Sequence, residues 1–113
     1  MTRDELCSVK FEEYERECLD QIYDIVAPHS DMAKNERYFV NGIIRYLKPV
    51  KILEVGISKG GGTAIILNAI KDFPHSQLIS ADYCEKYYGG GTDKLSGWLV
   101  DEKFSHLKDK WTV

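Results

Sequence analysis

Apolar residues recur at helical spacing between residues 11 and 26, while charged residues, mostly acidic, occupy the intervening positions. This pattern predicts one amphipathic helix of about six turns, packed against its own domain or a partner. The apolar positions of this stripe are Phe11, Tyr14, Cys18, Leu19, Ile22, Ile25 and Val26.

A second helix is predicted over residues 32–47. Pro28 breaks the first pattern, and Ser30 or Asp31 is suited to cap the helix that follows. Pro49 ends it, because the residue before a proline is disfavoured in helical geometry. The side chains expected to point inward are Met32, Phe39, Ile43, Ile44 and Leu47.

From residue 50 the apolar pattern becomes that of alternating strands and helices. Residues 50–55 are short, β-branched and apolar, which is typical of a strand buried on both faces. Strands are also predicted at 77–82 and 111–113. Helices are predicted at 61–73, covered on more than one side, and at 92–107, opened by Thr92 or Asp93 and burying Leu95, Trp98, Leu99 and Phe104.

This order of elements predicts an α/β fold: a partial Rossmann-like parallel sheet of about three strands, preceded by N-terminal helices. We assign residues 1–30 to the amphipathic lead and residues 31–113 to the N-terminal half of the Rossmann-like domain. If the strands are ordered 3-2-1, the first lies at an edge, and an uncovered apolar edge favours pairing with another chain. We therefore expect a homo-oligomer, held by the lead helix, the sheet edge or both.

Composition excludes several classes of function. The net charge of −3 argues against a nucleic-acid surface, and no stretch approaches the ~18 apolar residues of a membrane span. Three scattered cysteines suit a reducing cytoplasm better than a disulfide scaffold. The three histidines are not spaced from these cysteines as metal ligands would be, so no metal site is predicted.

The candidate chemistry lies in the segment ILEVGISKGGGTAIIL, residues 52–67, where a strand turns into a helix through glycines. The dinucleotide fingerprint G-x-G-x-x-G fits at Gly56 and Gly61, but Ser58 replaces its middle glycine. The P-loop pattern fails because Gly62 occupies the position of its lysine. Neither phosphate-binding motif is therefore complete.

Glu54 argues further against a phosphate ligand. It lies at the carboxyl end of the first strand, where ligands of open α/β sheets bind. Two like charges about 4 Å apart repel by ~1 kcal/mol in water and by more inside a protein. A ligand with a cationic end fits this position better.

The segment ILEVGISKGGGT resembles motif I, E-x-G-x-x-x-G, of the class I S-adenosylmethionine-dependent methyltransferases, and is most similar to those acting on small molecules and glycans. LISADY falls where that family has its second strand, which ends in an acidic residue. The resemblance covers residues 36–113. It implies S-adenosylmethionine as cofactor and a small molecule or glycan as methyl acceptor.

The resemblance also implies roles for individual residues. Glu54 would lie near the cofactor's ammonium group, Asp82 would accept the ribose hydroxyls, and Tyr83 would flank the adenine. A helix or turn cap is the alternative role for Asp82. The backbone expected to line the methionine part is that of Gly56, Ile57, Ser58 and Gly60.

The chain departs from this family in length, because class I domains have about seven strands and the acceptor-positioning residues follow the third. We therefore identify no catalytic residue and expect the 113 residues alone to be inactive. Two hypotheses remain: the cofactor-binding half of a methyltransferase, or a non-catalytic α/β module for nucleotide or adenosine binding or for oligomerisation. NAD-dependent chemistry is disfavoured by Glu54 and Ser58.

Overall fold

Three parallel strands form the sheet of this protein: β1 (Lys51–Val55), β2 (Gln77–Ala81) and β3 (Trp111–Thr112). They lie in the order β1-β2-β3, so β1 is an edge strand. The structure is a computed structural model and describes residues 2–82 and 94–113. The predicted α/β class, the parallel sheet and the position of the first strand at an edge are confirmed.

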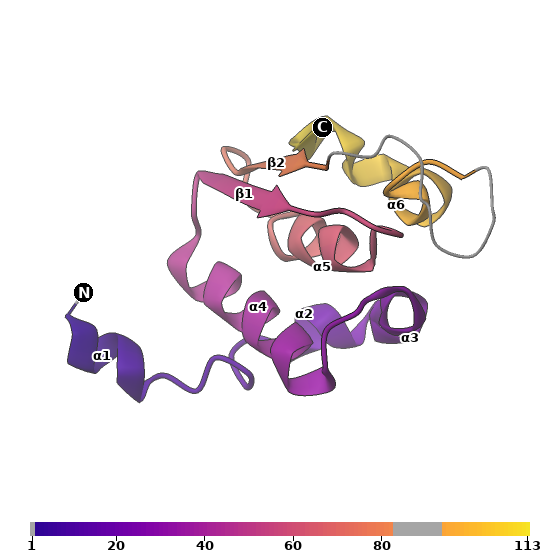
Figure 1. The fold of residues 1–113 in the computed structure, drawn as a ribbon. Helices are drawn as coiled ribbons and strands as arrows, with labels where there is room; N and C mark the ends of the chain where they lie inside the picture. The colour runs from indigo at the N-terminus through magenta and orange to yellow at the C-terminus, as the bar shows by residue number, and fades with distance from the viewer. Residues whose placement is uncertain (1, 83–93) are drawn as a thin grey trace.

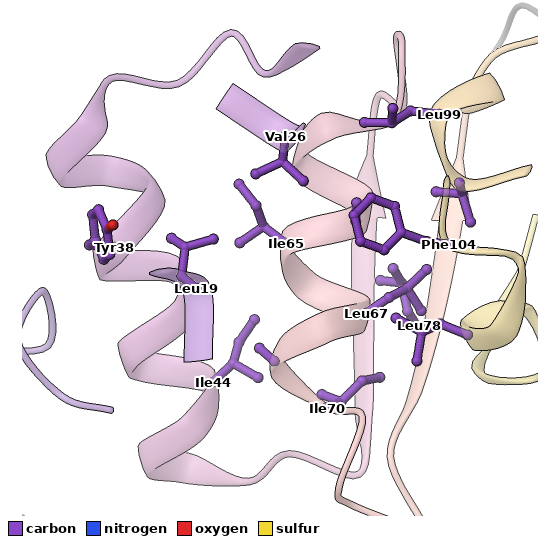
Figure 2. Close-up of a cluster of buried hydrophobic side chains, with 14 residues drawn as sticks. Leu19, Val26, Tyr38, Ile44, Ile65, Leu67, Ile70, Leu78, Leu99 and Phe104 are labelled. Carbon is purple, nitrogen blue, oxygen red and sulfur yellow. The ribbon is translucent and has the colours of Figure 1, made fainter. Parts of the chain in front are cut away.

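Helix α5 (Gly61–Ala69) connects β1 to β2 and lies between the sheet and helix α4 (Lys34–Leu47) (Figure 1). Nearly all of α5 is buried, as the sequence predicts for a helix covered on more than one side. Figure 2 shows the two halves of the core: Ile65 points from α5 toward Leu19 and Val26, whereas Leu67 points toward Leu78 and Phe104.

The N-terminal lead is not one continuous helix, which corrects the sequence prediction. It consists of α1 (Arg3–Ser8), α2 (Arg16–Asp20), α3 (Tyr23–Val26) and the 3₁₀ helix η1 (Ala27–His29). Residues 16–26 nevertheless contribute to the common core, through Leu19 and Val26.

Two tertiary contacts account for the breaks. Glu15 takes a left-handed conformation (φ 45°), and its carboxylate accepts hydrogen bonds from Nε and Nη2 of Arg45 at 3.0 and 2.8 Å. The carbonyl of Cys18, which a continuous helix would pair with the N–H of Ile22, instead accepts from Nδ2 of Asn68 at 2.9 Å. Long-range contacts thus override the local helical pattern.

The buried face of α4 also differs from the prediction. Phe39 and Leu47 are about half exposed, and the buried residues are Tyr38, Asn41, Gly42 and Ile44. Gly42 decides this orientation, because a Cβ atom there would lie only 1.6 Å from the carbonyl oxygen of Phe11. The helix therefore presents its smallest residue, rather than its most apolar stripe, to the N-terminal segment.

The helix before β3 is shorter than predicted. Helix α6 (Trp98–Lys103) begins after Gly97, whose φ is 78°, and the 3₁₀ helix η2 (Ser105–Lys110) follows it. Leu95 is half exposed, whereas Leu99 and Phe104 are buried as expected. Thr92 and Asp93, the predicted helix openers, lie outside the described residues.

No described residue in 2–82 or 94–113 covers one face of the sheet, which corrects the expectation that β1 is buried on both faces. Ile52 and Glu54 point toward α5, but Leu53 and Val55 are 68% and 81% exposed. Ile79, the neighbour of Leu53 in register on β2, is also exposed. Apolar side chains on an open sheet face beside a free edge strand favour association with another apolar surface.

We predict that the protein self-associates at micromolar concentration and that Leu53→Lys shifts it toward the monomer without loss of thermal stability. The side chain at this position is mostly in solvent, so a charge there acts on association and little on folding. Leu47→Lys, an exposed leucine on α4, is the matched control. Light scattering measures the mass, and a monomeric wild type would contradict the prediction.

Candidate functional site

A cavity of about 370 Å³ lies at the carboxyl end of β1, where open α/β sheets bind ligands. Part of its lining comes from β1 and the loop after it, as predicted, and part from the chain before α4. The described residues that line it are His29, Ser30, Asp31, Met32, Glu36, Glu54, Val55, Gly56, Ile57, Ser58 and Gly62.

The loop between β1 and α5 alternates between ordinary and left-handed backbone. Gly56, Ser58 and Gly60 have φ values of 89°, 54° and 104°. Open space surrounds the position of a Cβ at Gly56, so glycine is required there by its φ and not by crowding. Ser58 takes the same region as a non-glycine residue, which is uncommon.

Gly60 faces away from the cavity. It is buried, and a Cβ atom there would lie 3.0 Å from Cα of Gly97. The N–H of Gly97 donates to the carbonyl of Ser58 at 2.7 Å, and the N–H of Leu99 donates to the carbonyl of Lys59 at 3.0 Å. This glycine therefore allows α6 to pack on the loop, while Gly56, Ile57 and Ser58 line the cavity.

Asp82 fixes the conformation of the same loop. Its Oδ2 accepts hydrogen bonds from the backbone N–H groups of Ile57 and Ser58, at 2.9 and 3.4 Å. Such charge-assisted bonds are stronger than neutral ones. The sequence left two roles open for Asp82, a ribose acceptor and a turn cap. The structure shows the hydrogen bonds of a turn cap, and they place Asp82 next to the predicted cofactor loop.

Glu54 is a partly buried carboxylate in the lining of the site. Its Oε1 accepts hydrogen bonds from the hydroxyl of Thr63 at 2.6 Å and that of Ser80 at 2.8 Å. Burial raises the pKa of Glu54, and the two hydroxyl donors partly oppose that rise, while the charge of Asp82 adds to it. The surroundings of Glu54 in the folded protein therefore disfavour its charged form.

The wall formed by residues 29–32 was not anticipated from the sequence. Arg37 of α4 anchors it, because Nη2 donates to the carbonyls of Ala27 and Ser30 at 3.2 and 3.0 Å. On the other side, Gly61 lets η1 approach α5, since a Cβ there would lie 2.3 Å from the carbonyl oxygen of His29. The sequence marked this segment only by Pro28, as a helix breaker, and by Ser30 or Asp31, as the cap of the next helix. The cap of α4 is Ala33 instead, so that prediction was wrong.

The described lining of the cavity is acidic. It contains the carboxylates of Asp31, Glu36 and Glu54, and none of these lining residues is Lys or Arg. Oε1 of Glu36 accepts from the N–H of Ala33 at 2.8 Å, which holds that side chain at the start of α4. Such a lining attracts cations and repels phosphates.

Tyr83, the residue expected to flank the adenine, lies outside the described residues. Within residues 2–82 and 94–113, no three His, Cys, Asp or Glu side chains are arranged to hold a metal ion. None of the helices in these ranges combines the length and hydropathy required to cross a membrane.

The chain matches no protein-family model, no curated protein and no solved structure.

We predict that Asp82→Ala lowers the free energy of unfolding by about 1–3 kcal/mol, because two backbone N–H groups of the loop lose their acceptor. Asp82→Asn retains an acceptor oxygen and should lose less. Chemical denaturation of the three proteins measures the difference. Equal stability of Asp82→Ala and the wild type would mean that the loop holds its conformation without this carboxylate.

A second prediction concerns Glu54 and pH. Because its pKa is raised on folding, the folded protein holds the proton more tightly, and this group makes stability fall as pH rises above 4.5, its ordinary pKa. Glutamine keeps an oxygen for Thr63 and Ser80 but carries no charge. We expect Glu54→Gln to be at least as stable as the wild type at pH 7, with a flatter dependence of stability on pH. A clear loss of stability at pH 7 would contradict this.

Proposed function

We propose that this chain binds S-adenosylmethionine and is the cofactor-binding half of a cytoplasmic methyltransferase that acts on a small molecule or glycan. The observation that carries the proposal is the acidic cavity at the carboxyl end of β1, with the partly buried carboxylate of Glu54 in its lining. S-adenosylmethionine carries an ammonium, a sulfonium and one carboxylate, so its net charge is positive, and it has no phosphate.

The charges of the cavity support this ligand over nucleotides. NAD and ATP bring several negative charges, which would meet Asp31, Glu36 and Glu54 with no lysine or arginine in the described lining. At an effective dielectric constant of about 20, a pair of like charges 4 Å apart costs about 4 kcal/mol. A cationic ligand gains a comparable amount and offsets part of the burial cost of Glu54.

The loop gives the proposal its second support. With Gly56 and Ser58 in left-handed conformations, the backbone of residues 56–58 lines the cavity, so the methionine part would contact main-chain atoms. A carboxylate offers about four acceptor positions. Asp82 would therefore accept from a ribose hydroxyl as well as hold the loop. We assign no catalytic residue.

A non-catalytic role in oligomerisation is the second candidate. It is favoured by a separate observation, the exposed apolar side chains of Leu53, Val55 and Ile79 on the uncovered face of the sheet. Both functions are compatible with one chain, because Leu53 and Ile79 lie on the face of the sheet and outside the cavity lining, which Val55 alone of the three joins.

Isothermal titration with S-adenosylmethionine, S-adenosylhomocysteine, NAD and ATP tests the proposal. We expect the two adenosyl-amino acids to bind more tightly, and Glu54→Gln to weaken them at least tenfold, about 1.4 kcal/mol, since glutamine cannot neutralise an ammonium. Glu17→Gln, an exposed acid of α2 outside the cavity, is the charge-matched control. Tighter binding of NAD or ATP would overturn the proposal.

A further inference from the structure

A second cavity, of about 340 Å³, adjoins the candidate cofactor site. It lies between α4 and the segment before α2, and it shares two lining residues, Met32 and Glu36, with the first cavity. These two side chains therefore form a wall that the two cavities share. The described residues that line the second cavity are Glu12, Met32, Asn35, Glu36, Phe39 and Val40.

The apolar part of this lining includes an unusually exposed aromatic ring. Phe39 is 45% exposed, although the edge-to-face contact of its ring with Phe11, 5.7 Å between centroids, fixes its position. Met32 and Val40 supply the rest of the apolar wall. A ring that is held in place but left open to a cavity offers a prepared contact for an apolar or cationic group.

The polar part of the lining is negative. Glu12 and Glu36 are its two charged residues among those described, and Glu12 makes no hydrogen bond or ion pair within the described chain. An ammonium group beside an aromatic face and two carboxylates gains from both the ring quadrupole and the opposite charges. A further cavity shares Glu12 and Asn35 with the second one, but its lining also contains Arg16 and Lys34. The preference for cations therefore does not extend into that cavity.

We propose that the second cavity binds an organic ammonium with an apolar substituent and is the subsite for the methyl acceptor. The shared wall of Met32 and Glu36 is the observation that joins it to the cofactor site. The acceptor role rests on the proposed function, whereas the binding of organic cations does not. The acceptor is then an amine of the small-molecule class rather than a neutral glycan. For transfer, the bound ammonium loses one proton to solvent, the nitrogen lone pair forms the new N–CH3 bond, and the S–CH3 bond of the sulfonium breaks to leave S-adenosylhomocysteine.

Three probes of one shape but different charge test the binding: phenethylammonium, 2-phenylethanol and phenylacetate. We expect phenethylammonium to shift the backbone amide resonances of Asn35, Phe39 and Val40 and to bind at least fivefold more tightly than either of the others. The preference should weaken as salt is added, because it is electrostatic. Equal binding of the three probes, or no binding of phenethylammonium, overturns the inference.

Variants of residues that line the second cavity but not the first give an independent test. Glu12→Gln and Phe39→Ala should each weaken phenethylammonium at least threefold and leave S-adenosylhomocysteine binding unchanged. Glu13→Gln and Leu47→Ala are the matched controls, an exposed acid and an exposed apolar residue outside both cavities. Thermal melts identify any variant that unfolds, and the comparison of probes on the wild type does not depend on variants.

The outcomes separate the two proposals. Cation binding that depends on Glu12 and Phe39, without any binding of S-adenosylhomocysteine, overturns the proposed function and the acceptor role but supports the cation site. Binding of S-adenosylhomocysteine with no preference for the ammonium probe supports the proposed function and overturns the second subsite. Tighter binding of phenethylammonium in the presence of S-adenosylhomocysteine supports both, since the two cavities share a wall.

Discussion

The partly buried carboxylate of Glu54 links the elements on which this structure depends. It accepts hydrogen bonds from Thr63 of α5 and Ser80 of β2, and the hydroxyl of Ser80 in turn accepts from the indole Nε1 of Trp111 in β3 at 2.9 Å. One acidic side chain is thereby connected to all three strands and to the central helix. An apolar residue would avoid the desolvation cost at this position, but it would leave both hydroxyls without their acceptor.

The candidate site is assembled around this group from distant parts of the chain. Asp82 holds the loop after β1, α6 packs on the loop through Gly97, and Arg37 holds the wall formed by residues 29–32. Each of these contacts joins segments that are close only in the folded protein. The N-terminal lead is therefore part of the site as well as part of the core, and a ligand in the cavity touches both halves of the sequence.

The sequence predicted those features that follow from local pattern. The strands and the helix after the glycine loop were predicted from apolar runs, and the glycines and Asp82 were singled out by the resemblance to a known motif. The breaks in the lead at Glu15 and Cys18, and the orientation of α4 at Gly42, were not, because each is decided by a contact with a distant residue. The wall at residues 29–32 escaped prediction for the same reason, since its carbonyls are held by Arg37 and its residue types carry no motif.

The central inference is that the partly buried carboxylate of Glu54 is the binding group for a cationic ligand. The most direct measurement is the pKa of this one side chain, followed by carbon-13 NMR of the glutamate carboxyls with and without S-adenosylmethionine, and assigned with Glu54→Gln. We expect the pKa of Glu54 to lie above its ordinary value in the free protein. When the ligand binds, this pKa should fall to the ordinary value or below it, because the ammonium stabilises the charged form. A pKa that the ligand leaves unchanged would contradict the claim.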